Sequence, residues 1–107
     1  MLPKTKRLNL KKDFRVVVKG KRVETAHFRL YFTNFDNKEP KIGISLSKKS
    51  FKKAVLRSKA RRMSSFAIEK IYGDLPPSIN LIMMPKAGIL ETDKEMLVQE
   101  LRKGLLG

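Results

Sequence analysis

The chain has 107 residues, of which 41% are hydrophobic, so it is long enough for one compact domain with a core and too short for two. It contains no cysteine, which excludes disulfide bonds, thiolate metal sites and thiol nucleophiles. Its 25 Lys and Arg residues exceed its 10 Asp and Glu residues and give a formal charge of +15, which favours a polyanionic partner.

The first basic block is also the first predicted helix. Residues 1–23 contain nine basic residues and one acidic residue. Within this block, four apolar residues share one helical face: Leu10, Phe14, Val17 and Val18. Three consecutive valines also favour extended structure, but Gly20 is a typical helix stop. We therefore predict a short helix over residues 10–19.

Two alternating segments follow. Residues 26–33 and 41–47 alternate apolar and polar side chains, and the segment between them is rich in the Asn, Asp and Pro of turns. We predict an antiparallel hairpin with one buried face. The other face carries Tyr31 beside the small residues Gly43 and Ser45, which leaves room for a partner to lie across it.

The second basic block is predicted to be a long helix. Residues 48–63 contain eight basic residues and no acidic residue, and helical spacing extends from Ser50, a plausible N-cap, to Ile71. Apolar residues form one stripe on this helix: Leu56, Ala60, Met63, Ala67 and Ile71. Polar and basic residues form the opposite face: Arg57, Ser58, Lys59, Arg61, Arg62 and Ser65. The pattern predicts a helix that packs on a sheet and displays an organised positive face.

The last two elements complete a single domain over residues 1–107. Residues 79–84 are a short apolar run between turn signals, typical of an inner strand. Thr92 and Glu95 form a capping box, and the helix that follows carries an apolar stripe of Met96, Leu97, Leu101 and Leu105. We predict an α+β fold, a two-layer sandwich of three helices and about four strands.

The sequence offers little for catalysis by protein side chains. Its one histidine, His27, lies at the edge of a predicted strand, where a surface or hydrogen-bonded role is more typical than a catalytic one. The carboxylates of residues 93–95 open a helix, where the dipole favours negative charge. No P-loop, dinucleotide-binding glycine motif or G-x-S-x-G motif is present. We predict no catalytic residue and no metal site in the protein itself.

The stretch "IGISLSKKSFKKAVLRSKARRM" resembles the strand and basic helix of the protein subunit of bacterial ribonuclease P, in which Ser-Lys-Lys is followed after a few residues by Ala-Val-x-Arg-Asn-x-x-Lys-Arg. The segments "RLNLKKDFRVVVKG", "FRLYF" and "MMPKAG" are also similar to that family. The resemblance covers nearly the whole chain in the right order and spacing. It implies the element order αβββαβα with an unusual left-handed βαβ crossover.

The resemblance also implies a function. In that family an RNA subunit is the catalyst and uses bound Mg²⁺, while the protein binds this RNA and the 5′ leader of precursor tRNA and promotes 5′ maturation. The implied partners are these two RNAs, with no membrane, no small-molecule substrate and no cofactor bound by the protein alone.

The resemblance places two RNA contacts on named residues. The implied contacts with the catalytic RNA are Lys53, Arg57, Ser58, Lys59, Arg61 and Arg62. The implied leader-binding cleft consists of Phe14, Val18, Tyr31, Lys48, Lys49 and Lys86. Proteins bind single-stranded RNA with aromatic rings that stack on its bases and with cations that contact its phosphates.

Three positions depart from the family pattern. Ser58 replaces the usual Asn, Ser65 stands where an Arg is common, and Val18 stands where a second Phe is usual. Ser58 is shorter than Asn and lacks the paired donor and acceptor of an amide. We expect a weaker or rearranged contact at Ser58 and weaker leader stacking at Val18.

Other function classes share some of these features. A ribosomal or other non-enzymatic RNA-binding protein would have the same charge and basic helix without any dependence on a tRNA leader. The basic helix could also be a solvated face or a localisation signal. A membrane-active protein is disfavoured because the helix has few bulky aromatic residues. No apolar run approaches the roughly 18 residues of a membrane span, and no signal peptide is apparent, so we expect a cytoplasmic protein.

Overall fold

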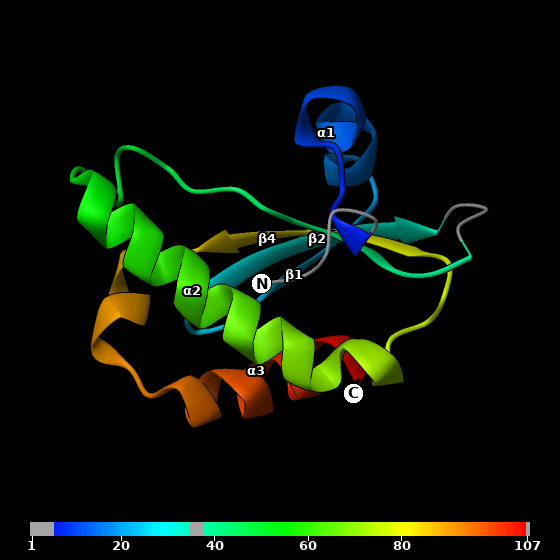
Figure 1. Cartoon of the computed structure of the whole chain (residues 1–107). Coiled ribbons are helices and arrows are strands. Elements are labelled where there is room, and N and C mark those ends of the chain that lie inside the picture. The colour runs from blue at the N-terminus through cyan, green and yellow to red at the C-terminus, as the bar shows by residue number, and fades with distance from the viewer. Residues whose placement is uncertain (1–5, 35–37, 107) are drawn as a thin grey trace.

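The computed structural model of the chain describes residues 6–34 and 38–106, which form three α-helices and one four-stranded sheet (Figure 1). The elements in chain order are α1 (Leu10–Val18), β1 (Lys21–Glu24), β2 (Phe28–Asn34), β3 (Lys41–Ile44), α2 (Ala54–Ile71), β4 (Ile79–Pro85) and α3 (Lys94–Leu106). Short 3₁₀ turns, η2 (Tyr72–Asp74) and η3 (Ala87–Glu91), follow α2 and β4. The predicted α+β class and the order αβββαβα are confirmed. Within the described ranges, no helix combines the length and the apolar character needed to cross a membrane.

The strands lie in the order β1-β2-β4-β3, with β4 antiparallel to β2 and parallel to β3. The predicted hairpin between residues 26–33 and 41–47 is therefore wrong, because β4 separates those two strands. All residues of β4 except Met84 are buried, as is typical of an inner strand that pairs on both edges. β2 forms its hairpin with β1 instead. No alternating pattern predicts β1, because "KRVE" carries a single apolar side chain.

Helices cover both faces of the sheet (Figure 1). α2 and α3 pack on one face around a core that includes the fully buried Phe28, Leu30 and Leu81. The sheet and these two helices form the two-layer sandwich that the sequence predicts. α1 packs on the other face, where Val17 and Ile82 are fully buried. α2 connects the parallel strands β3 and β4, and the left-handed sense of this crossover stays a prediction.

α1 forms where the apolar spacing predicts it. At its start, the Asn9 side chain accepts a hydrogen bond of 3.3 Å from the backbone N–H of Lys12. At its end, the N–H of Gly20 donates a hydrogen bond of 3.0 Å to the Val17 carbonyl. A Cβ at Gly20 would lie 2.5 Å from the carbonyl oxygen of Phe32. The glycine therefore stands where α1 meets β2 too closely for any side chain.

α2 begins after Lys53, so the predicted N-cap at Ser50 is wrong. Ser50 instead belongs to a turn. The backbone N–H of Ser50 donates a hydrogen bond of 3.4 Å to the Ser47 hydroxyl. Phe51 is fully buried and anchors the segment between this turn and the helix. Four of the five residues of the predicted apolar stripe are buried: Ala60, Met63, Ala67 and Ile71.

Ser65 was predicted on the outer face of α2, but it is 4% exposed. It lines a small hollow together with Leu8 and Ile42. The segment before α1 covers the edge of β3 there, because the N–H of Leu8 donates a hydrogen bond of 2.9 Å to the Ile42 carbonyl. Helical spacing alone cannot reveal cover by a distant segment.

α3 starts one residue later than the capping box predicts. Its first turn is capped by the Asp93 carboxylate, which accepts a hydrogen bond of 3.3 Å from the N–H of Glu95, rather than by Thr92. Leu97 and Leu101 are fully buried, as the predicted stripe requires. Met96 was also assigned to this stripe, but its side chain is 62% exposed, because the core contacts begin one residue further on.

Candidate RNA-binding surfaces

The outer side of α2 carries a continuous set of exposed polar and basic residues. We call Lys53, Ser58, Lys59, Arg61 and Arg62 the α2 basic face. The Lys59 ammonium approaches the Leu90 carbonyl oxygen at 3.4 Å. The side chains of Lys53, Arg61 and Arg62 form no hydrogen bond or ion pair with any other residue in the described ranges. Their charges are therefore available to a polyanion.

Arg57 differs from the other predicted contacts of this helix. It is half-buried, and its Nη1 donates hydrogen bonds to the carbonyl oxygens of Phe51 (2.7 Å) and Lys52 (3.4 Å). The predicted outward position of Arg57 is corrected accordingly. Because α2 begins at Ala54, the preceding residues form a loop, and the carbonyl oxygens of this loop are within reach of Arg57 in the first turn of the helix.

On the other face of the sheet, α1 and the strands form a partly exposed apolar surface. Phe14, Val18 and Tyr31 are all half-buried and pack around the buried Val17 and Ile82. We call Phe14, Val18 and Tyr31 the α1 junction. The structure thus brings these three predicted leader-cleft residues together. Most of each side chain is covered by packing, and the rest stays accessible.

A groove of about 260 Å³ lies on the same face of the sheet, at the end of β4. Its lining residues are Arg29, Ser45, Ser47, Ser50, Met84, Pro85, Lys86 and Ala87. We call this hollow the basic groove. Lys86 was predicted for the cleft, and the exposed Lys48 and Lys49 lie on the turn between Ser47 and Ser50. Met84 packs in the cluster of the α1 junction as well, so groove and junction are continuous.

Arg29 is a groove residue that the resemblance did not identify. The only signal for it was its position two residues before Tyr31 on the open face of the predicted strand. Arg29 Nε donates a hydrogen bond of 3.1 Å to Glu24 Oε1, which also lies 3.4 Å from Arg22 Nη2 and 3.8 Å from Lys86 Nζ. The hydrogen bond from Arg29, assisted by Lys86 and Arg22, lowers the pKa of Glu24 below its ordinary value of 4.5. Three cations around one carboxylate leave this end of the groove positive.

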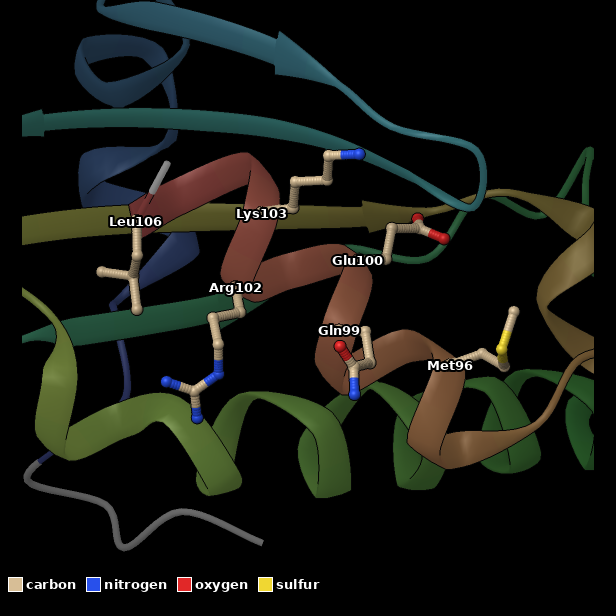
Figure 2. Close-up of a pocket in the computed structure, with 6 residues that line it drawn as sticks. All are labelled: Met96, Gln99, Glu100, Arg102, Lys103 and Leu106. Carbon is tan, nitrogen blue, oxygen red and sulfur yellow. The ribbon is translucent and has the colours of Figure 1, made fainter.

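A further hollow of about 580 Å³ lies on the outer side of α3 (Figure 2). Six residues line it: Met96, Gln99, Glu100, Arg102, Lys103 and Leu106. Arg102 is already paired with Asp74 at 3.0 Å, and Glu100 adds negative charge. This surface therefore has fewer free positive charges for a phosphate backbone than the basic groove has.

Comparisons with known proteins agree with this arrangement. The sequence model of the family described as Ribonuclease P matches residues 2–106. The ribonuclease P protein component of Microcystis aeruginosa is 30% identical over 112 residues, covering 98% of this chain and 92% of that protein. The corresponding component of Picosynechococcus sp. is 29% identical, covering 98% and 91%. The solved RNase P protein from Thermotoga maritima has a TM-score of 0.82 at 23% identity, covering 92% of this chain and 94% of that one, which supports the fold. The chain therefore belongs to the ribonuclease P family and is a protein component of that endoribonuclease.

Proposed function

We propose that this protein component holds two RNA segments at once: the catalytic RNA on the α2 basic face and the 5′ leader of precursor tRNA on the opposite side of the sheet. The observation that carries the proposal is the separation of the two surfaces. α2 covers one face of the sheet and α1 lies on the other (Figure 1). The α1 junction and the basic groove are on the face that carries α1. Two RNA segments can therefore bind without competing for the same side chains.

The α2 basic face suits a structured RNA. The backbone that carries its cations belongs to a packed helix. Only the side chains must therefore become ordered when they contact the phosphates of a folded RNA. Neutralising about four phosphates, one for each cation of this face, would release counterions and give a log-log salt slope of about −3 to −4. We expect Arg61→Ala and Arg62→Ala to weaken binding of the RNA subunit and to make this slope shallower. Lys103→Ala, which removes an exposed cation from α3, is the matched control.

The α1 junction and the basic groove suit a single strand. Phe14 and Tyr31 can stack on unpaired bases, and stacking contributes about 1 to 3 kcal/mol per base. Lys86 and Arg29 in the groove, with Lys48 and Lys49 on the adjoining turn, can contact the phosphates. Because Met84 joins the two surfaces, one strand could run across both.

The chemical step falls to the RNA partner under this proposal. The catalytic RNA and its bound Mg²⁺ supply hydrolysis at the 5′ end of the tRNA, in the cytoplasm. The protein's part is to neutralise phosphates and to align the leader, which lowers the cost of bringing two polyanions together. We expect its largest effect at low Mg²⁺, where the RNA has fewest other counterions.

Reconstitution tests the proposal directly. The purified chain is added to the cognate ribonuclease P RNA and to other bacterial ribonuclease P RNAs at low Mg²⁺, and release of the 5′ leader from precursor tRNA is followed. The expected result is stimulation of cleavage and tighter binding of precursor tRNA than of mature tRNA. Absence of stimulation with all of these RNAs would defeat the proposal and favour a non-enzymatic RNA-binding role.

A further inference from the structure

Glu100 on α3 is tied to the turn between β1 and β2 by three contacts. Its Oε2 accepts hydrogen bonds from the Thr25 hydroxyl (2.5 Å) and from the backbone N–H of His27 (2.8 Å). Its Oε1 lies 2.7 Å from His27 Nδ1. Figure 2 shows the Glu100 side chain extending from α3 toward this turn. The side chain is 15% exposed, so little water competes for these contacts.

The same turn holds Lys86. The backbone N–H of Lys86 donates a hydrogen bond of 2.8 Å to the carbonyl oxygen of His27. Its Nζ donates one of 2.9 Å to the carbonyl oxygen of Thr25. The Nζ also lies 3.8 Å from Glu24 Oε1. An ammonium group has three N–H donors, so a donor remains for a further acceptor. The Lys86 side chain is 38% exposed and lines the basic groove, where a phosphate could take up that donor.

Thr25 therefore belongs to both sets of contacts. Its hydroxyl is bound by Glu100 and its carbonyl binds Lys86. A free Lys side chain has about 2 kcal/mol of rotamer entropy, so a fixed carbonyl is needed to keep its ammonium in one place. Without the carboxylate, the turn loses its contacts with α3. It keeps its two hydrogen bonds from Lys86 and its local hydrogen bonds, such as the one of 2.8 Å between the Thr25 N–H and the Phe28 carbonyl.

We propose that Glu100 is a positioning residue for the leader: by fixing the turn between β1 and β2, it fixes the carbonyl that holds the Lys86 ammonium at the rim of the basic groove. This inference rests on the proposed leader-binding function. It assigns part of that function to a side chain on α3, which packs on the face of the sheet opposite the groove.

The test compares holoenzymes reconstituted with different protein variants. Affinity is measured for precursor tRNA and for the same tRNA without a leader. Glu100→Ala should weaken binding of precursor tRNA by roughly threefold to tenfold, the loss of about one hydrogen bond, and leave leaderless tRNA unchanged. Glu100→Gln keeps an acceptor oxygen for Thr25 and His27 and should keep most of the leader preference. Glu91→Ala removes an exposed carboxylate elsewhere and controls for charge.

The double variant with Lys86→Ala provides the decisive comparison. If both residues act through one ammonium, Glu100→Ala should cause no further loss of leader preference in the Lys86→Ala background. Thr25→Val removes the hydroxyl that Glu100 binds and should cause a smaller loss that is also confined to the leader. This variant provides the same comparison should Glu100→Ala fold poorly.

Three outcomes would overturn the inference. An equal loss on both tRNAs would mean that Glu100 only stabilises the fold. Equal effects of Glu100→Ala, Glu100→Gln and Glu91→Ala would mean that only net charge matters. A leader-specific loss in Lys86→Ala with none in Glu100→Ala would leave the proposed function standing without this residue. Absence of any leader preference in the wild-type holoenzyme would instead overturn the proposed function together with the inference.

Discussion

The guanidinium of Arg57 lies 2.7 Å from the carbonyl oxygen of Phe51 and donates a hydrogen bond to it. This contact closes the loop that links the turn carrying Lys48 and Lys49 to the first turn of α2. The loop borders the basic groove through Ser50 and leads into the α2 basic face. One half-buried cation therefore braces the connection between the two proposed RNA surfaces.

Arg57→Ala should destabilise the protein, whereas Arg61→Ala should not. A hydrogen bond from a charged donor contributes about 1.5 to 3 kcal/mol, so we expect a loss near the lower value for this half-buried group. The exposed Arg61 has no partner in the described ranges, and its removal should change stability by less than about 0.5 kcal/mol. Urea unfolding of both variants measures the difference. Equal stabilities would show that the Phe51 contact contributes nothing.

Gly20→Ala should destabilise the protein because of a backbone contact. The added Cβ would lie 2.5 Å from the carbonyl oxygen of Phe32 in β2, so α1 or the strand must shift. Such overpacking typically costs about 1 to 3 kcal/mol. Gly73→Ala is the matched control, because a Cβ there meets nothing within 4 Å. Thermal unfolding should place Gly20→Ala below the wild type and Gly73→Ala at or above it.

The helices could be predicted from the sequence because their signals are local. Leu10, Phe14 and Val17 mark α1 within about two turns, and the stripe from Ala60 to Ile71 marks α2. The charged face of α2 follows from the same periodicity, since residues opposite a buried stripe must face outward. For this reason Arg61 and Arg62 were predicted correctly as exposed residues.

The sheet order could not be predicted because it depends on pairings between distant residues. Two alternating segments joined by a turn favour a hairpin, but insertion of β4 buries a far more apolar strand. The same reason applies to the position of Arg57, which depends on where α2 begins, and to Ser65, which the segment before α1 covers. Glu100 gave no signal because its partner His27 lies 73 residues away.

Ser58→Asn should strengthen binding of the RNA subunit without changing stability. Ser58 is exposed and its side chain has no hydrogen bond with the described residues, so the change removes no side-chain contact from the fold. The amide supplies a donor and an acceptor that can reach further, and one added hydrogen bond corresponds to about a twofold to tenfold gain. Footprinting and titration of the RNA subunit with Ala, Ser and Asn at this position should give affinities in that order. Unchanged protection across the series would contradict a contact here.

Val18→Phe should strengthen leader binding. Val18 is half-buried in the α1 junction beside Phe14 and Tyr31, where a third ring would extend the surface on which bases can stack. We expect roughly a threefold to tenfold gain for precursor tRNA and none for leaderless tRNA. Val16→Phe is the control, because Val16 is 50% exposed and lies outside the junction cluster. The same gain from both variants would indicate non-specific adhesion of the ring.

Lowering the pH should weaken the attachment of α3 to the β1–β2 turn. Burial raises the pKa of Glu100, but the hydrogen bonds from Thr25 and His27 outweigh it and leave the pKa below the ordinary value of 4.5. A carboxylate whose pKa is lower in the folded state stabilises the fold above its unfolded pKa, and this contribution is lost as the pH falls through the folded pKa.

The difference in melting temperature between wild type and Glu100→Gln should therefore be constant down to about pH 5 and shrink below about pH 4.5. Glu24, whose pKa is also lowered, is present in both proteins, so its titration cancels in the comparison. A difference that persists unchanged to about pH 3 would mean that the Glu100 carboxylate is not the group that holds the turn.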